Sequence, residues 1–373
     1  MAEGLLISKD EFETRLQHTQ DLMKQKDLDG LIVFSGFQER EGHVSYLTNH
    51  HIAFPNVLSH VGLGHSALVL PLEGLGTLIS PIGYEANKVV NIDVAKTGFV
   101  LVADILAAVK EKGLDSGRIG IVGMDVIPAE YYEIIKKSMG KATFEAANEI
   151  IEAMRLIKSP AEIELLRKAA WVADAALIAG MEAAREGATG HDVELAVRSA
   201  GLEAGADFIP RVRVSTGPKL QALNWPMATR KKIAKDDFVY LDVIGWAGGY
   251  GFDNSRIKVV GKPTDEQRSY LDHVVEATEW MIGVLKPGAR LGFVMTMSRE
   301  RQIVAFGHGI GLEICENPWL TLAPTKTLIE PNMVLCIEPN VTDRKFGGMC
   351  IEDMVAITDT GIEVLNRCPR VLW

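Results

Sequence analysis

The sequence predicts two domains of different fold class: an α/β domain over residues 1–154 and an α+β domain with a mainly antiparallel sheet over residues 155–373. The length of 373 residues suits about two domains of ordinary size. Helix and strand patterns alternate through the first part of the chain, which is typical of α/β structure. In the second part, strand patterns follow one another and helices are segregated from them, which favours antiparallel pairing.

The first domain is expected to form three layers, with helices on both faces of a central sheet. Apolar residues recur at helical spacing in residues 9–28, and the apolar run LIVF at 31–34 follows the turn signal Asp29-Gly30. The same alternation continues to about residue 140. The further expected helices are 103–114 and 128–140, and the further expected strands are 65–72, 76–82 and 118–124.

The second domain is expected to begin with a long helix. Ser159 is a suitable N-cap, Pro160 suits the first helical position, and Glu162 and Glu164 lie near the positive end of the helix dipole. The helix is expected to run to about residue 186. The remaining expected helices are 190–204 and 264–285, with Thr264 as N-cap, and the expected strands are 211–217, 238–260, 333–341 and 350–358.

Charge and cysteine usage exclude several classes of function. The net charge of −10 argues against a nucleic-acid or anionic-membrane surface, because both need a basic footprint. No apolar run approaches the roughly 18 residues of a spanning helix, and the early acidic residues do not suit a signal peptide. The four cysteines form no Cys-x-x-Cys pair, so we expect a reducing, cytoplasmic location. These cysteines are Cys315, Cys336, Cys350 and Cys368.

Two aspartates mark a glycine-rich hairpin in the second domain. Asp242 and Asp253 lie in apolar strand patterns on either side of a segment with four glycines. A hairpin can bring the two carboxylates together, and buried carboxylates side by side demand a cation. The alternative is a surface hairpin whose aspartates serve turns and caps.

Three further side chains complete a candidate metal site. His308 stands between two glycines, which allow a close backbone approach, whereas Glu338 and Glu352 lie within apolar strand patterns where unpaired glutamates are seldom tolerated. Four carboxylates and one imidazole suit two hard or borderline divalent ions. Such ions about 3.5–4 Å apart form a known hydrolytic device. The sequence therefore predicts a metal-dependent hydrolase.

At these residues the chain resembles the pita-bread-fold metallohydrolases, which include methionine aminopeptidase, prolidase, aminopeptidase P and creatinase. The resemblance covers about residues 155–373, and the segments DGLIVF and VSYLTN also resemble the creatinase-type N-terminal domain. It implies a curved sheet and two divalent ions, of manganese, cobalt, zinc or iron. A hydroxide between the two ions would attack the scissile carbonyl.

The resemblance also implies a role for each ligand. Asp242 would bind one ion, Asp253 and Glu352 would bridge the two, and His308 and Glu338 would complete the second. Glu338 would in addition shuttle the proton of the nucleophile.

Three positions depart from the pattern of the peptidases in this family. Asn224 and Cys315 stand where those peptidases usually have histidines, and Cys350 stands where prolidases and aminopeptidase P usually have an arginine. Histidines at the first two positions can stabilise charge that develops near the tetrahedral intermediate, which asparagine and cysteine cannot do as cations. These changes favour a different substrate. The cysteines are suited to plain packing, but strand alternation also places Cys336 on the face of Glu338 and Cys350 on the face of Glu352, so that they could lie close to the ions.

Other residues are candidates for the surroundings of the site. Trp225 and Trp246 could form the wall of a substrate pocket or pack in the core. Arg256 could pair with a ligand carboxylate or a substrate carboxylate. In a homodimer, His50 or His51 could enter the partner's pocket and supply an imidazole. The alternative for this histidine cluster is a solvated loop.

Three functions remain to be compared. The first is an Xaa-Pro dipeptidase or aminopeptidase that cleaves an amide bond of a short peptide. The second is a non-peptidase member of the fold, like creatinase or ectoine hydrolase, that acts on a C–N bond of a small metabolite. The third is a binding protein that has lost catalysis. The presence of all five predicted metal ligands argues against this third function.

Overall fold

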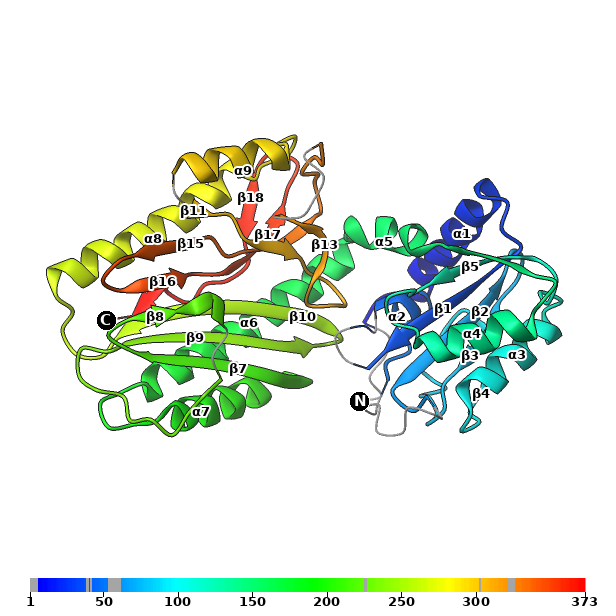
Figure 1. Ribbon diagram of the computed structural model, residues 1–373, viewed down its shortest axis with the longest axis horizontal. Coiled ribbons are helices and arrows are strands. Elements are labelled where there is room, and N and C mark those ends of the chain that lie inside the picture. The colour runs from blue at the N-terminus through cyan, green and yellow to red at the C-terminus, as the bar shows by residue number, and fades with distance from the viewer. Residues whose placement is uncertain are drawn as a thin grey trace. The chain divides into compact units, whose positions relative to one another are not determined.

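The computed structural model describes residues 6–37, 40, 42–52, 62–224, 227–301, 303–320 and 326–372 (Figure 1). The chain divides into two compact units, Met1–Arg155 and Leu156–Trp373. Each unit has its own hydrophobic core. Among the described helices, none combines the length and the apolar character needed to cross a membrane.

The first unit is built on a six-stranded mixed sheet with the order β4-β3-β2-β1-β5-β6. All seven residues of the central strand β1 (Gly30–Gly36) are buried, as expected for a strand covered on both faces. Ile32 and Phe34 share a core with α3 (Leu101–Glu111) and α4 (Ala129–Ser138). The α/β prediction is confirmed. The other elements are α1 (Lys9–Gln25), α2 (Gly42–Thr48), β2 (His65–Pro71), β3 (Gly76–Ile79), β4 (Ile92–Lys96), β5 (Arg118–Val122), β6 (Thr143–Ala146) and α5 (Asn148–Leu156).

The sequence patterns missed four elements of this unit, namely α2, α5, β4 and β6. The strands β4 and β6 are the two edges of the sheet, and most of their residues are exposed or half-buried. An edge strand therefore shows no apolar run. The helix α2 is only seven residues long and wholly buried, so it has no polar face to reveal a helical period.

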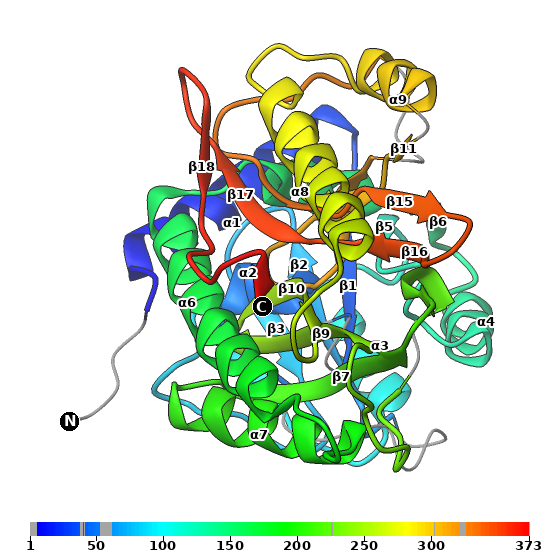
Figure 2. The same cartoon turned by 90° about the vertical axis from the view of Figure 1, so that its left-hand side faces the viewer.

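The second unit contains three sheets, with the orders β19-β10-β9-β7, β11-β15-β16-β8 and β13-β12-β14-β17-β18. Pairing is antiparallel except between β10 and β19 and between β8 and β16. Figure 2 shows α6 and α7 beside β7, β9 and β10. The prediction of an α+β domain with mainly antiparallel strands is confirmed. The helices are α6 (Pro160–Ala183), α7 (Gly190–Glu203), α8 (Asp265–Val284) and α9 (Leu291–Glu300). The strands are β7 (Phe208–Gly217), β8 (Leu220–Gln221), β9 (Phe238–Ala247), β10 (Tyr250–Val259), β11 (Ile303–Val304), β12 (Gly307–Gly309), β13 (Glu316–Trp319), β14 (Val334–Ile337), β15 (Asn340–Asp343), β16 (Gly347–Cys350), β17 (Asp353–Ile357), β18 (Ile362–Val364) and β19 (Val371–Leu372).

Two helices of this unit begin at the predicted caps. The Ser159 side chain accepts a hydrogen bond from the Glu162 N–H, and the Glu162 carboxylate accepts one from the Ser159 N–H. Thr264 and Gln267 form the same reciprocal pair at the start of α8. Each such pair satisfies backbone donors that the first turn of a helix leaves without partners. The helix α6 ends at Ala183, slightly before the expected residue 186.

The stretches 333–341 and 350–358 are each divided into two strands, which corrects the prediction of one continuous strand in each. The first is interrupted at Glu338-Pro339, and the second at Ile351-Glu352. The strands β14 and β17 pair in one sheet, whereas β15 and β16 pair in another. The chain thus passes between two sheets at each glutamate. Apolar residues lie on both sides of each break, so the hydrophobic pattern alone indicates one continuous strand.

Candidate metal centre

The hairpin of β9 and β10 places two aspartates on one face. The strands are joined by Gly248 and Gly249, which both have positive φ angles, as a tight two-residue hairpin turn requires. Asp242 pairs with Ser255, and Asp253 lies two residues before Ser255 on the same strand. Because alternate residues share a face, both carboxylates project to the same side. They are diagonal neighbours rather than directly opposite residues.

The strand β12 brings His308 to the same region. His308 pairs with Cys336 of β14, and a Cβ on Gly307 would collide with the carbonyl oxygen of Cys336. The glycine before the histidine therefore allows the close backbone approach that the sequence suggested. Glu352 arrives from the crossing between β16 and β17, where its N–H donates to the carbonyl oxygen of Ser255.

Three carboxylates form the first ligand cluster. Carboxylate oxygens of Asp242, Asp253 and Glu352 lie within 4.8 Å of one another, and all three side chains are buried. Asp242 Oδ1, Asp253 Oδ1 and Glu352 Oε1 are buried atoms without a hydrogen-bond partner among the described residues. Buried carboxylate oxygens without partners are costly, so these three atoms fit a cation as their common partner.

The imidazole of His308 faces two of the carboxylates. Its Nε2 lies 3.8 Å from Asp253 Oδ2 and 3.8 Å from Glu338 Oε1. Its Nδ1 lies 3.0 Å from the carbonyl oxygen of Gly309, and since a carbonyl only accepts, Nδ1 carries the proton and Nε2 keeps its lone pair. Burial lowers the pKa of His308 to about 4. A neutral imidazole with a free Nε2 is the form that binds a metal ion.

A second ligand cluster shares a residue with the first. One nitrogen of His308, the Cys336 sulfur and an oxygen of Glu352 lie within 4.8 Å of one another. Glu352 therefore belongs to both clusters, as a bridging ligand would.

Burial and mutual repulsion dominate the electrostatics of the carboxylates. Burial raises the pKa of Glu338 well above its usual value, and the Asp253 and Asp242 carboxylates raise it further. Burial followed by the neighbouring carboxylates also raises the pKa values of Asp253 and Glu352. Carboxylates in this state are ionised only at a high free-energy cost unless a positive charge joins them. Divalent cations supply that charge, so the residues present fit such ions.

An arginine missed in the sequence patterns contacts the first cluster. Arg213 on β7 is the cross-strand neighbour of Asp242, and its Nη1 lies 2.9 Å from Asp242 Oδ2. The Tyr240 hydroxyl lies 3.5 Å from the same oxygen and 3.3 Å from the Cys350 sulfur. Arg213 lies between two valines in a strand, just as Glu338 lies within an apolar strand pattern. A charged residue in such a pattern is seldom buried without a partner, so the same criterion could have identified Arg213.

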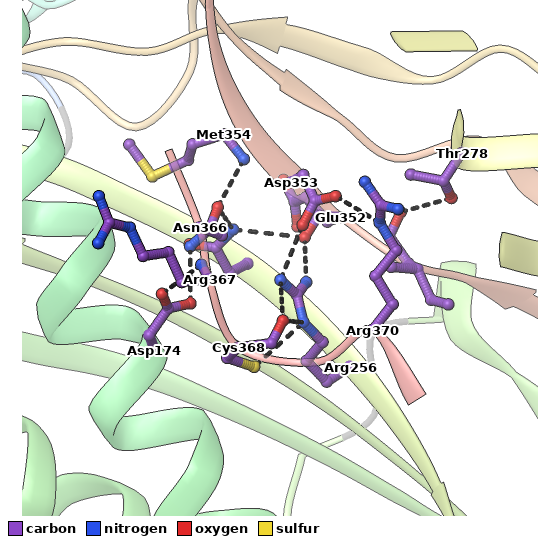
Figure 3. Close-up of polar contacts among 12 residues, drawn as sticks. Asp174, Arg256, Thr278, Glu352, Asp353, Met354, Asn366, Arg367, Cys368 and Arg370 are labelled. Atoms are coloured by element: carbon purple, nitrogen blue, oxygen red, sulfur yellow. Dashed lines mark hydrogen bonds and ion pairs between the residues drawn. The ribbon is translucent and has the colours of Figure 1, made fainter. Parts of the chain in front are cut away.

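Arg256 binds the backbone of Glu352 and does not pair with the side chain of any predicted metal ligand. Figure 3 shows its side chain beside Glu352, Asp353 and Cys368. Arg256 is 1% exposed; its Nη1 donates to the Glu352 carbonyl oxygen at 2.6 Å and its Nη2 to Asp353 Oδ1 at 2.7 Å. Arg370 binds the other oxygen of Asp353. The expectation that Arg256 pairs with a ligand or substrate carboxylate is therefore wrong, because the guanidinium is enclosed beneath the backbone of Glu352.

We expect Arg256→Met to weaken metal binding by roughly 10- to 100-fold, the usual effect of removing a residue that orients a ligand. The substitution removes the donor that holds the Glu352 backbone and one of the two arginine partners of Asp353. Isothermal titration with the divalent ion measures the effect. Arg167→Met, which breaks an exposed ion pair with Glu363, is the matched control. Unchanged affinity in a folded Arg256→Met protein would contradict this role.

The remaining predicted neighbours of the site have different environments. Asn224 is exposed at the end of the 3₁₀ helix Ala222–Asn224, and Trp225 lies outside the described residues. Trp246 is buried, donates from Nε1 to the Leu312 carbonyl oxygen and stacks on Phe208. Trp246 thus packs against the loop that follows His308. The half-buried Cys315 packs against the same small hydrophobic cluster as Trp246.

The two histidines proposed for a partner's pocket belong to the first unit. His50 is 3% exposed, and burial lowers its pKa to about 4. His51 is exposed. His50 therefore packs within its own unit, and only His51 of this pair is exposed.

Comparison with known proteins identifies the family. Residues 164–359 match the model of metallopeptidase family M24, and residues 15–157 match that of the creatinase/prolidase N-terminal domain. The chain is 31% identical over 249 residues to an Xaa-Pro dipeptidase of Pyrococcus furiosus, which covers 64% of this chain and 71% of the relative. It is 29% identical over 278 residues to the Xaa-Pro dipeptidase of Pyrococcus horikoshii, covering 72% of this chain and 76% of the relative. The solved Xaa-Pro dipeptidase from Bacillus anthracis superposes with a TM-score of 0.80 at 25% identity, covering 97% of this chain and all of that one.

The M24 match spans the hairpin of β9 and β10, β12 and both glutamate crossings. It therefore includes every residue of the two ligand clusters. The chain belongs to metallopeptidase family M24 and is a metal-dependent hydrolase with a creatinase/prolidase-type N-terminal domain.

Proposed function

We propose that the protein is a dinuclear metallopeptidase that hydrolyses the amide bond before proline in short Xaa-Pro peptides. The observation that carries the dinuclear part is the membership of Glu352 in both ligand clusters, because two ions held close together need a shared carboxylate. The substrate part is supported by relatives that are Xaa-Pro dipeptidases.

The residues suggest how two ions are held. Asp242, with Asp253 and Glu352 as shared ligands, would hold one ion, and His308 and Glu338 would complete the other with the same shared carboxylates. Oxygen-rich sites with an imidazole accept manganese, cobalt, zinc or iron.

The protein's own groups then divide the work of hydrolysis. Divalent ions at this site supply Lewis acidity toward a carbonyl and lower the pKa of water. Glu338, a buried carboxylate whose Oε1 lies 3.8 Å from His308 Nε2, is suited to take the proton of the attacking water and pass it to the leaving nitrogen. His308 keeps Nε2 directed at Glu338 and Asp253 through the contact of Nδ1 with Gly309. Arg213 holds Asp242 in place from the neighbouring strand.

A second candidate function is hydrolysis of a C–N bond in a small metabolite, as in creatinase or ectoine hydrolase. It is favoured by Asn224, Cys315 and Cys350, which stand where peptidases of the family usually have two histidines and an arginine. Asparagine and cysteine cannot supply the positive charge with which histidine or arginine would stabilise a developing oxyanion, so these three positions suit a different substrate.

A substrate panel with the full-length protein separates the two functions. We expect manganese-, cobalt-, zinc- or iron-loaded protein to release proline from Xaa-Pro dipeptides, and a chelator to abolish the release. Matched Xaa-Ala dipeptides are the control for specificity, and creatine and ectoine represent the alternative. Cleavage of a C–N bond in either metabolite without cleavage of any Xaa-Pro dipeptide would replace the peptidase proposal, and metal-loaded protein inert toward both kinds of substrate would contradict both.

The proposal extends to assembly and location. We expect a cytoplasmic homodimer that binds neither nucleic acid nor membranes, in keeping with the net charge of −10. Light scattering coupled to gel filtration measures the mass of the assembly.

A further inference from the structure

Cys336 stands among the metal ligands by the register of its strand. It lies on β14, directly opposite His308 on β12 and Met354 on β17. Directly opposite residues of antiparallel strands project from the same face of the sheet. The Cys336 side chain therefore points to the side from which His308 approaches the carboxylates.

The face opposite to Cys336 is the one that packs in the hydrophobic core. Leu335 and Ile337, its neighbours along β14, belong to the core of the second unit, and Cys350 belongs to another of its clusters. Cys336 itself is fully buried on the other face of the strand, the face that it shares with His308.

Several polar atoms lie near the Cys336 sulfur. The sulfur, one nitrogen of His308 and one oxygen of Glu352 lie within 4.8 Å of one another, and all three residues are at most 2% exposed. The sulfur also lies 3.7 Å from the Asp253 carbonyl oxygen. Glu352 Oε1 has no hydrogen-bond partner among the described residues. A buried acceptor without a partner beside a thiol and an imidazole indicates a ligand that binds all three.

We propose that Cys336 is itself a metal ligand, whose thiolate joins His308 and Glu352 in holding a thiophilic divalent ion such as Zn²⁺ or Co²⁺. The inference rests on the metal centre of the proposed function and specifies which ions it takes. When the ion binds, the Cys336 sulfur–hydrogen bond breaks, the proton passes to water, and the sulfur–metal bond forms.

Binding of a single ion needs a contraction of this cluster. Zinc lies about 2.3 Å from a thiolate sulfur and about 2.0–2.1 Å from an imidazole nitrogen, so in a tetrahedral site two ligand atoms are about 3.3–3.6 Å apart. The three ligand atoms of this cluster lie within 4.8 Å of one another. Binding of the ion would therefore draw any two of them together by at most about 1.5 Å, through rotation of the side chains.

The thiolate changes which metal the site prefers. Sites of carboxylates and imidazole generally bind manganese more weakly than cobalt or zinc, and a thiolate ligand widens this difference. We therefore expect zinc to bind at the Cys336 cluster more tightly than manganese. Cys336→Ser should weaken zinc binding by about tenfold or more, which is the lower end of the usual effect of losing a residue that supports a metal site. Manganese binding should change much less.

X-ray absorption of the zinc-loaded wild-type protein tests the proposal without any substitution. The expected spectrum contains a sulfur shell at about 2.3 Å beside the nitrogen and oxygen shell at about 2.0–2.1 Å. Bound zinc that has only nitrogen and oxygen neighbours would overturn the proposal, even if Cys336→Ser fails to fold.

Cobalt spectroscopy identifies the thiol responsible. Cobalt-loaded wild-type protein should show a sulfur-to-cobalt charge-transfer band in the near ultraviolet, and Cys336→Ser should lose it while keeping bound cobalt. Cys315→Ser and Cys350→Ser, which change the other two thiols of this region, should keep the band. A band that survives Cys336→Ser would assign the sulfur to another residue and overturn the proposal.

The outcomes separate this proposal from the metal centre on which it rests. If zinc and cobalt bind stoichiometrically without a sulfur neighbour, the Cys336 proposal fails and the proposed function stands. If neither ion nor manganese binds, the metal centre fails and the Cys336 proposal fails with it.

Discussion

Glu352→Gln should prevent stoichiometric metal binding at both clusters and lower hydrolysis by roughly a thousandfold or more. Glu352 is the residue that the two clusters share, and it is 1% exposed. An amide has nearly the shape of the carboxylate but lacks its negative charge, so the substitution removes a shared anionic ligand with little change in packing. Ions that activate water and polarise a carbonyl contribute several kcal/mol to catalysis, and about 1.36 kcal/mol corresponds to a tenfold change in rate. Metal analysis of the purified variant and its rate of hydrolysis measure the two effects.

Two further variants make this expectation specific. Glu330→Gln removes an exposed carboxylate from the same unit and should leave metal content and rate unchanged. Asp242→Asn alters a ligand that belongs to one cluster only, so this variant should keep the ion held by His308 and Glu352. The backbone of Glu352 is fixed by Ser255 and Arg256 in any case. Full metal content in Glu352→Gln would therefore show that Glu352 is not a bridging ligand.

The helix caps, the hairpin turn and the class of each domain could be predicted from the sequence, because they depend on residues that are close together in the chain or on the order of the elements. The caps Ser159 and Thr264 act through residues three positions away, and both helices begin where the sequence indicated. The hairpin turn needs positive φ angles, which glycine adopts readily, so Gly248 and Gly249 marked it. The class of each domain followed from the order of helix and strand patterns, since that order limits which sheets can form.

The strand breaks at the two glutamates and the partners of Arg256 and Cys336 could not be predicted from the sequence, because they depend on which distant strands lie side by side. Glu338 and Glu352 lie at crossings between sheets, but apolar residues on both sides gave the appearance of continuous strands. Arg256 is three residues from Asp253, and only the fold shows that its partner is Asp353, which is 97 positions away. Strand alternation predicts that Cys336 shares a face with Glu338, but only the fold shows that it lies opposite His308, which is on a separate strand.

Arg213→Met should lower the free energy of unfolding of the metal-free protein by about 3–5 kcal/mol, the usual consequence of leaving a buried charge without its partner. Arg213 Nη1 lies 2.9 Å from Asp242 Oδ2, and the Asp242 side chain is 3% exposed. For a unit of this size, about 1 kcal/mol corresponds to a shift of roughly 2–4 °C in Tm. The metal-bound protein should lose less stability, because the ion supplies a positive charge to the same carboxylate. Thermal unfolding with and without divalent ions measures both values.

The loss should also depend on pH in a defined direction. Burial raises the pKa of Asp242 and Arg213 opposes this rise, so removing the guanidinium raises the pKa further. Protonation then relieves the unpaired charge, and the destabilisation should therefore shrink as the pH falls and grow as it rises through that pKa. Arg211→Met, on the same strand but exposed, is the matched control. In the double variant Arg213→Met/Asp242→Asn, the loss should be smaller than the sum of the two single losses. A loss that is equal with and without metal and independent of pH would mean that Arg213 stabilises the sheet by packing and not by its charge.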